Sequence, residues 1–455
     1  MNAKINIHFL GASETVTGSK FLVETGRKNI LIDCGLFQGL KELRLRNWAA
    51  LPVDVSKIDH VILTHGHLDH VGYLPLLLKQ GFKGNIYATQ PTIEIAKLIL
   101  QDSAKIQEED AVRANKYGYS KHHPAVPLYT VGEAKAVFEY FNATTVNQWI
   151  ELEPAISFRF KYVGHIIGAT FVELKIDNKI LVFSGDIGRL EDPIMRKPEK
   201  PQQADYLFIE STYGDRNHPG DTENKLAALI NKLATKKGTI IIPSFAVERA
   251  QLLMYYLWKL LREKKIPAIP VYMDSPMGTL VLEVFKNSPI WHKLSADDCN
   301  QICNDIKIIK KQEQTEALAR TKTPKIIIAS SGMASGGRVL TYFEHYLDDP
   351  TATIMLTGYQ GEGTRGRDLL DGAKEIKMRG KWWKVRAEVV LAEGLSAHAD
   401  QTELIDWMSE LKNKPKQVFI IHGEKRAAMA FQKKLDEVYQ MKAIIPQMNQ
   451  VINLA

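Results

Sequence analysis

The chain has 455 residues, of which 45% are hydrophobic and 24% are charged, and its formal net charge at pH 7 is +7. This length allows two or three domains, and the mildly basic charge permits a polyanionic partner without demonstrating one. Three cysteines form no even framework, and no apolar run reaches the ~20 residues that span a membrane, so we expect a reducing, cytoplasmic compartment.

The first half of the chain is rich in predicted strands. Apolar or alternating runs predict strands at residues 5–10, 20–24, 29–33, 60–64, 85–88, 157–163, 170–175 and 180–184. Helical periodicity appears near residues 72–80, 91–114 and 131–141.

The pattern changes after about residue 213, where strands and helices begin to alternate. Strands are predicted at residues 239–243, 271–273, 325–329, 353–357 and 386–390, and helices at 223–236, 248–263, from 278 and at 338–346. Such alternation implies a parallel sheet covered on both faces. A helix at 402–412, a strand at 418–421 and a helix from Lys425 follow. We interpret the chain as one domain interrupted by a second, inserted domain.

The most informative run is Thr64-His65-Gly66-His67-Leu68-Asp69-His70, which follows the apolar residues 61–63. Neutral imidazole and carboxylate groups suit a borderline cation such as zinc. Their spacing cannot place all four candidate ligands on one helix face. We therefore expect a loop at a strand end and a helix that begins near Asp69, with His65 and His67 facing one ion and Asp69 and His70 facing another.

Further candidate side chains follow strand-like runs or lie in a short turn. They are Asp33, His165, Asp186, Glu210, His398 and His422. Each has an ordinary structural interpretation when taken singly, because a strand-end aspartate often caps a helix and a lone histidine often lies in a core. Rigid strand ends can also deliver side chains to one shared site. The whole set beside the histidine-rich run favours that second interpretation.

This arrangement resembles the metallo-β-lactamase superfamily. The resemblance rests on Asp33, the run at residues 65–70, His165 and Asp186, in that order. Glu210 in FIESTYG, His398 in SAHAD and His422 in IHGE resemble three further motifs of the β-CASP nucleases, as do residues 242–251, 330–333 and 358–366. His422 makes the chain similar to the RNA-cleaving branch, which includes bacterial and archaeal homologues of the cleavage and polyadenylation endonuclease. The DNA-repair branch lacks that histidine.

The resemblance implies two zinc ions per chain and a role for each residue. One zinc is expected on His65, His67 and His165, and the other on Asp69, His70 and His422, with Asp186 bridging them. Asp33 is expected to orient a ligand imidazole from outside the ligand set. The expected catalytic residues are Asp69, Asp186, Glu210 and His398. His398 is the candidate general acid, and Glu210 would hold its tautomer and raise its pKa.

The inserted domain carries a small-residue turn at residues 330–338, between a predicted strand and a predicted helix. Its backbone N–H groups are candidates for cradling a phosphate. The expected contacts to RNA phosphates are Arg249, Ser331, Gly332, Gly336, Arg338 and Arg365. A plain turn and ordinary surface arginines are the alternatives.

Residues 379–386, RGKWWKVR, interleave basic and aromatic side chains. They are suited to stacking unpaired bases. The favoured interpretation is an amphipathic strand whose tryptophans pack against the insert, because the run leads into a strand pattern.

Together these observations predict an αββα metallo-β-lactamase sandwich, residues 1–212 and 388–455, with an inserted α/β β-CASP domain at 213–387 that contains a mostly parallel sheet. The predicted function is hydrolysis of single-stranded RNA, most simply as an endonuclease, by a hydroxide activated by two metals. A 5′ exoribonuclease of RNase J type, a small-molecule metallohydrolase and a catalytically dead RNA-binding scaffold are the alternatives. No membrane partner is expected, and the sequence leaves a homodimer and other protein partners open.

Overall fold

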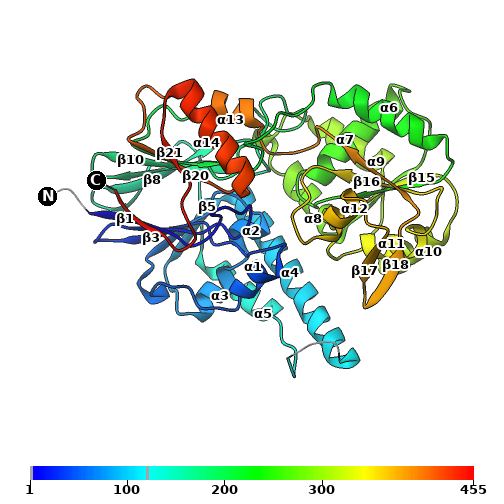
Figure 1. Ribbon diagram of the computed structural model, residues 1–455, viewed down its shortest axis with the longest axis horizontal. Coiled ribbons are helices and arrows are strands. Elements are labelled where there is room, and N and C mark those ends of the chain that lie inside the picture. The colour runs from blue at the N-terminus through cyan, green and yellow to red at the C-terminus, as the bar shows by residue number, and fades with distance from the viewer. Residues whose placement is uncertain (1–3, 119–121, 455) are drawn as a thin grey trace. The chain divides into compact units, whose positions relative to one another are not determined.

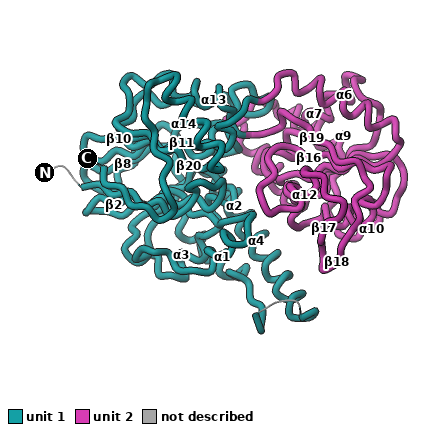
Figure 2. Tube along the Cα trace, viewed as in Figure 1, with its two compact units in different colours: residues 1–217, 398–455 teal, residues 218–397 magenta. Residues whose placement is uncertain are grey.

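The computed structural model describes residues 4–118 and 122–454 and divides into two compact units. Unit 1 contains residues 1–217 and 398–455, and unit 2 contains residues 218–397 (Figure 2). The predicted boundaries, 212/213 and 387/388, both lie earlier in the chain. The second differs because strand β19 (Glu388–Ala392) pairs with β16 (Thr353–Thr357), so residues assigned to the returning segment complete the sheet of unit 2.

Unit 1 is built on two seven-stranded sheets. The first has the order β22 (Val451–Leu454), β1 (Ile5–Phe9), β2 (Phe21–Glu24), β3 (Asn29–Ile32), β4 (His60–Ile62), β5 (Asn85–Thr89) and β6 (Phe141–Thr144). The second has the order β21 (Ala443–Ile444), β20 (Gln417–Ile421), β11 (Tyr206–Glu210), β10 (Lys179–Phe183), β9 (Thr170–Ile176), β8 (Ile156–Tyr162) and β7 (Ile150–Glu153).

The core of unit 1 lies between these sheets. Alternate residues of β1 and β8 are buried, as expected for strands with one face toward a core. The Phe183 and Phe208 rings stack at 4.2 Å within the second sheet. Phe9 of the first sheet contacts Phe419 of the second at 5.5 Å, and Phe21 contacts Phe183 at 6.2 Å. Aromatic pairs therefore join the two sheets.

Helices cover the outer faces of the sandwich (Figure 1). Five lie beside the first sheet: α1 (Lys41–Arg46), α2 (Leu68–Val71), α3 (Leu74–Lys79), α4 (Gln90–Tyr117) and α5 (Val131–Ala136). Helices α13 (Gln401–Trp407) and α14 (Lys425–Tyr439) lie beside the second. The predicted αββα architecture is confirmed. Within residues 4–118 and 122–454, no helix is long and apolar enough to cross a membrane.

Each sheet of unit 1 contains a run of parallel neighbours. Strands β3 to β6 are parallel to one another, and so are β10, β11, β20 and β21. Parallel strands end at the same edge of a sheet, so the segments that follow them lie close together. Asp33, residues 63–70, Asp186, Glu210 and His422 all occupy these positions.

Unit 2 contains a six-stranded sheet in which every neighbouring pair is parallel. Its order is β14 (Lys307–Ile308), β13 (Val271–Asp274), β15 (Lys325–Ala329), β12 (Thr239–Pro243), β16 and β19. Every residue of β12, β15 and β16 is buried, as expected where helices cover both faces. The helices are α6 (Thr222–Ala234), α7 (Arg249–Arg262), α8 (Pro276–Lys286), α9 (Ala296–Asp305), α10 (Gln312–Arg320), α11 (Val339–Tyr346) and α12 (Arg365–Leu370). A separate hairpin is formed by β17 (Glu375–Met378) and β18 (Lys381–Lys384).

Candidate metal centre

The histidine-rich run forms a tight connection between β4 and α2. Asp33 fixes its start, because its Oδ1 accepts hydrogen bonds from the backbone N–H of Thr64 at 2.8 Å and from the Thr64 hydroxyl at 3.0 Å. A Cβ atom at Gly66 would lie 2.6 Å from a side-chain carbon of Ile95, so only glycine fits between His65 and His67. Helix α2 begins at Leu68, one residue before Asp69, where its start was predicted.

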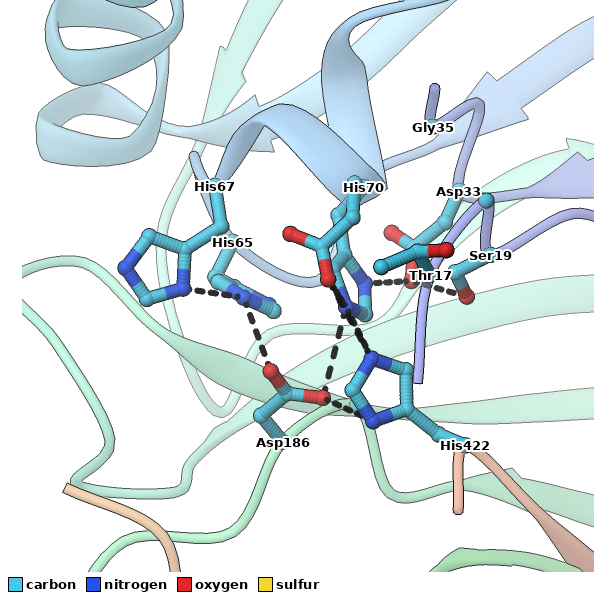
Figure 3. A network of polar contacts seen from close by, with 12 residues as sticks. Thr17, Ser19, Asp33, Gly35, His65, His67, His70, Asp186 and His422 are labelled. Atoms are coloured by element: carbon cyan, nitrogen blue, oxygen red, sulfur yellow. Dashed lines mark hydrogen bonds and ion pairs between the residues drawn. The ribbon is translucent and has the colours of Figure 1, made fainter. Parts of the chain in front are cut away.

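The first cluster of candidate ligands contains His65, His67, His165 and Asp186. The Nε2 atoms of His65 and His165 lie 3.1 Å and 3.2 Å from Nδ1 of His67. Asp186 Oδ2 lies 3.3 Å from His65 Nε2 and 3.5 Å from His165 Nε2. All four side chains therefore point at one small volume, and Figure 3 shows His65, His67 and Asp186 around it.

The second cluster contains Asp69, His70 and His422. The Nε2 atoms of His70 and His422 lie 3.2 Å apart, and Asp69 Oδ2 lies 3.4 Å from His422 Nε2. The other oxygen of Asp186, Oδ1, lies 3.3 Å from His70 Nε2 (Figure 3). One carboxylate thus presents one oxygen to each cluster.

The electrostatics of the two clusters suit divalent cations. Burial lowers the pKa of His67 to about 3, and it lowers the pKa values of His65 and His165 as well, so these imidazoles are neutral and can donate lone pairs. Burial also lowers the pKa of His70, but Asp186 and Asp33 outweigh it and hold that pKa well above the ordinary value. The carboxylates of Asp186 and Asp33 therefore favour a positive charge beside His70.

The polar atoms at the centre also fit a bound cation. Asp186 Oδ1 is buried and makes no regular hydrogen bond among the described residues, although it lies 3.3 Å from the candidate ligand atom His70 Nε2. Imidazole nitrogens and carboxylate oxygens are the ligands that zinc takes in proteins. The donor set therefore fits a pair of metal ions.

Neighbouring groups outside the clusters orient the ligand histidines. Asp33 Oδ2 lies 2.7 Å from His70 Nδ1, which leaves His70 Nε2 facing the second cluster. The hydroxyl groups of Thr64 and Thr212 lie 3.0 Å from His65 Nδ1 and 3.1 Å from His422 Nδ1. Such contacts fix the tautomer and orientation of a ligand imidazole. Neither threonine was predicted from the sequence, although Thr64 precedes His65 and Thr212 lies in the motif of Glu210.

His398 lies beside the first cluster and contacts Glu210. Its Nδ1 is 3.2 Å from Glu210 Oε1, and its Nε2 is 4.0 Å from Asp186 Oδ2. Burial lowers the pKa of His398, but the Glu210 carboxylate outweighs it and raises that pKa above its ordinary value. Glu210 is fully buried and also accepts the backbone N–H groups of Ile187 and Thr212. The imidazole is therefore held with Nε2 toward the clusters, and the Glu210 carboxylate favours its protonated form.

A buried ion pair holds the turn of His398 against the loop of Asp186. Glu403 accepts hydrogen bonds from the Arg189 side chain at 2.9 Å and from the backbone N–H of Leu190 at 3.0 Å. The same carboxylate accepts the backbone N–H of Asp400, and Ala399 N–H donates to the Ile187 carbonyl. Neither Arg189 nor Glu403 was singled out from the sequence, because a lone Arg or Glu carries no pattern that links segments so far apart.

The three arginines expected at RNA phosphates also contact groups within unit 2. Arg249 is buried and donates to the Thr357 carbonyl at 2.7 Å. Arg338 forms an ion pair with the buried Asp274. Arg365 donates to the carbonyls of Lys377 and Ser335. Each guanidinium group therefore has a partner within unit 2, and contacts of the three arginines with RNA phosphates remain a prediction.

The small-residue turn at 330–338 is also largely satisfied internally. The Ser331 hydroxyl accepts the backbone N–H groups of Ser335 at 3.1 Å and Gly336 at 3.2 Å. A Cβ atom at Gly332 would lie 2.6 Å from the Phe245 ring, so this glycine allows close packing. Ser331, Gly332 and Gly336 therefore build the turn, and the geometry gives no separate support for a phosphate cradle.

Three family profiles match the chain in sequence order. The metallo-beta-lactamase superfamily matches residues 16–244, the Beta-Casp domain matches residues 250–369, and the Zn-dependent metallo-hydrolase RNA specificity domain matches residues 382–446. The first covers the predicted ligands up to Asp186, and the third covers His398 and His422.

Curated relatives resemble the chain over most of its length. "Ribonuclease TTHA0252" of Thermus thermophilus is 33% identical over 434 residues, which cover 93% of this chain and 94% of that protein. "Transcription termination factor FttA" of Methanosarcina mazei is 30% identical over 448 residues, which cover 93% of this chain and 68% of that protein. The "RNase J-like protein" of Methanocaldococcus jannaschii is 29% identical, with 97% of each chain covered. A solved structure of a protein of unknown function from Enterococcus faecalis V583 shares the fold at a TM-score of 0.55 and 16% identity, covering 99% of this chain and 100% of its own.

Proposed function

The chain belongs to the β-CASP branch of the metallo-β-lactamase superfamily, and from this membership we propose that it is a zinc-dependent ribonuclease that cleaves single-stranded RNA. The relatives named as ribonucleases support the substrate class, and the ligand clusters of unit 1 support the chemistry. In this proposal, His65, His67 and His165 hold one zinc, Asp69, His70 and His422 hold the other, and Asp186 binds both.

The observation that carries the proposal is the position of the Asp186 carboxylate. Its Oδ2 faces the first cluster and its Oδ1 faces the second, at 3.3 Å from a histidine nitrogen in each case. A pair of zinc ions held this way supplies an activated water and stabilises the charge of the phosphate. That chemistry suits phosphodiester hydrolysis.

The chain's own residues would supply the proton for the leaving group. The oxygen of water bonds to phosphorus as the bond between phosphorus and the leaving oxygen breaks. The leaving oxygen must then gain a proton. In this proposal His398 Nε2 donates it, supported by the contact of Glu210 with Nδ1 and by the Glu210 carboxylate, which raises the pKa of the imidazole. Asp33, Thr64 and Thr212 keep the ligand imidazoles oriented.

We propose endonucleolytic cleavage as the main activity. The alternative is 5′ exonucleolytic cleavage, which is favoured by the similarity to the RNase J-like protein over 97% of both chains. A circular RNA separates these two possibilities, because a circle has no end from which an exonuclease can start.

The test uses the purified full chain, loaded with zinc, on labelled linear RNA, circular RNA and single-stranded DNA of the same sequence. We expect cleavage of both RNAs and little cleavage of the DNA. The Asp186→Asn variant is the matched control for a contaminating nuclease, because it alters only the bridging carboxylate. Cleavage of linear RNA alone would assign an exonuclease, and equal activity of wild type and Asp186→Asn would refute catalysis at this centre.

A further inference from the structure

The hairpin of unit 2 presents two different faces. Strands β17 and β18 pair antiparallel with Lys377 opposite Trp382 and Ile376 opposite Trp383. The turn residues Arg379 and Gly380 both have positive φ angles, 49° and 79°, as a two-residue hairpin turn requires. Because side chains alternate along each strand, Lys377 and Trp382 point to one face and Ile376 and Trp383 to the other.

One face of the hairpin packs against unit 2. Ile376 and Met378 are buried, and Trp383 packs against the hydrophobic cluster formed by α11, β15 and β16. The Trp383 indole N–H also donates to the Met378 carbonyl at 3.3 Å. The prediction that the tryptophans of residues 379–386 pack against the insert therefore holds for Trp383.

The other face exposes Trp382 among basic side chains. Trp382 is 66% exposed, and Lys377 lies directly opposite it, while Lys384 follows two residues later on the same strand. Lys377 and Lys384 are exposed and form no ion pair with any residue in the described ranges. The single acidic neighbour in the hairpin is Glu375, opposite Lys384.

This surface suits a polyanion with flat rings better than an apolar protein surface. A protein partner that buries a tryptophan usually does so within an apolar patch, but the neighbours of Trp382 on this face are Lys377, Lys384 and Glu375. An indole can stack on any nucleobase, and lysines beside it can contact the flanking phosphates.

We propose that Trp382, Lys377 and Lys384 form an accessory binding site for single-stranded RNA, in which one base stacks on Trp382. This inference rests on the proposed function, since it assumes that RNA is the substrate. It adds a contact outside the metal centre, and its expected effect is on affinity and KM, with kcat unchanged.

The test measures binding of a short, unstructured, labelled RNA by fluorescence anisotropy at several salt concentrations, with His398→Ala in every protein to slow cleavage while the metal ions and the RNA affinity are retained. We expect Trp382→Ala to weaken binding about tenfold and Trp382→Phe to retain most of the affinity, because a phenyl ring still stacks. Lys377→Ala and Lys384→Ala should each reduce the slope of log K against log salt by about 0.7. Lys232→Ala, an exposed lysine of α6 in the same unit, is the matched control and should change neither quantity.

Three outcomes would count against the inference, and they are distinguishable. If the parent protein does not bind RNA, the proposed function itself fails. If the parent binds and Trp382→Ala binds equally well, the accessory site is refuted and the proposed function stands. If Trp382→Ala changes only the sedimentation of the protein, the surface contacts a second copy of the chain and the RNA assignment is wrong.

In an otherwise wild-type protein, Trp382→Ala should raise KM about tenfold with an unchanged kcat and an unchanged melting temperature, because the Trp382 side chain is mostly exposed.

Discussion

At the scale of single residues, Asp186 and His398 have the clearest division of roles. Asp186 touches both ligand clusters, whereas His398 touches Glu210 with one nitrogen and faces the clusters with the other. A bridging carboxylate neutralises two cations, and a general acid must stay free of them. Substitutions at the two residues should therefore fail in different ways.

Asp186→Asn should lose both zinc ions more readily than His422→Ala, which removes one ligand of one cluster. The measurement is elemental analysis after dialysis against a weak chelator, and the wild type should retain near two zinc ions per chain. A variant Asp186→Asn that keeps both ions would contradict the bridging role.

His398→Ala should keep its metal content and RNA affinity but lose about 10²- to 10⁴-fold in kcat, the usual contribution of a positioned proton donor. Glu210→Gln should lose less, because the imidazole remains. A substrate with a 5′-bridging sulfur at the scissile bond needs no proton on its leaving group, so it should restore much of the rate of His398→Ala. Loss of zinc from that variant, or no recovery on the sulfur substrate, would move His398 to a supporting role.

Lys20 offers a stability prediction of a different kind. Its ammonium group is fully buried, donates to the carbonyls of Gly18 and Gly35, and lies 4.5 Å from the centre of the Phe37 ring. Burial lowers its pKa from 10.5 to about 8. Between these pH values the unfolded chain binds more protons than the folded chain, so the contribution of Lys20 to stability rises with pH.

The difference in unfolding free energy between wild type and Lys20→Met should therefore grow, by at most about 3 kcal/mol, as the pH rises from about 8 to 10.5. Burial raises the pKa of the neighbouring Cys34 thiol to about 12, which acts in the opposite direction. Because Cys34 is present in both proteins, the difference between their unfolding free energies reports on Lys20, whereas the wild-type unfolding free energy alone combines both effects. Urea unfolding at several pH values gives the difference, and two parallel curves would show that Lys20 titrates normally.

At the scale of secondary-structure elements, the sequence predicted the strands and helices that have long, continuous apolar patterns. Most strands of the two large sheets and helix α4 were predicted because their patterns are continuous. The elements that were missed are the helices α1, α9, α10 and α12 and the strands β6, β7, β14, β17, β21 and β22. Helix α9, ADDCNQICND, has few apolar positions, and β22 has four residues that pair with β1, at the far end of the sequence. Short elements of this kind are specified by tertiary contacts more than by local pattern.

The ion pair between Arg189 and Glu403 allows a test at this scale, because it joins α13 to the loop after β10. Arg189→Met and Glu403→Gln should each lower kcat while metal content is retained, because the turn of His398 loses its support. The cost to stability should be about 1–3 kcal/mol for each variant. The double variant should be little worse than either single one, since both remove the same interaction. Additive losses in kcat would mean that the pair does not act as a unit.

At the scale of the whole molecule, the candidate ligands were predictable from sequence, but their geometry was not. The motifs identified every residue that the structure brings to the two clusters. No motif shows that Arg249, Arg338 and Arg365 are committed to carbonyls and to Asp274, because those contacts depend on how unit 2 folds. The same reason explains the boundary at 397/398, which depends on the pairing of β19 with β16.

Metal removal should loosen unit 1 locally. Hydrogen exchange measured with and without a chelator should speed up in peptides that cover residues 62–70, 163–170, 184–188 and 420–424, which carry the ligands. The central strands β12, β15 and β16 of unit 2 contain none of these ligands and should exchange at unchanged rates. Equal acceleration in both units would show that the metals stabilise the chain as a whole.

The order of the ligands along the chain also has a consequence for protein synthesis. The second cluster includes His422, and the proposed proton donor is His398, yet both follow the whole of unit 2 in sequence. Translation proceeds from the N-terminus, so a chain still growing on the ribosome holds the first cluster long before it can complete the second. Under the proposed function, a nascent chain with this arrangement cannot hydrolyse the messenger RNA that encodes it until translation has passed unit 2 and reached His422.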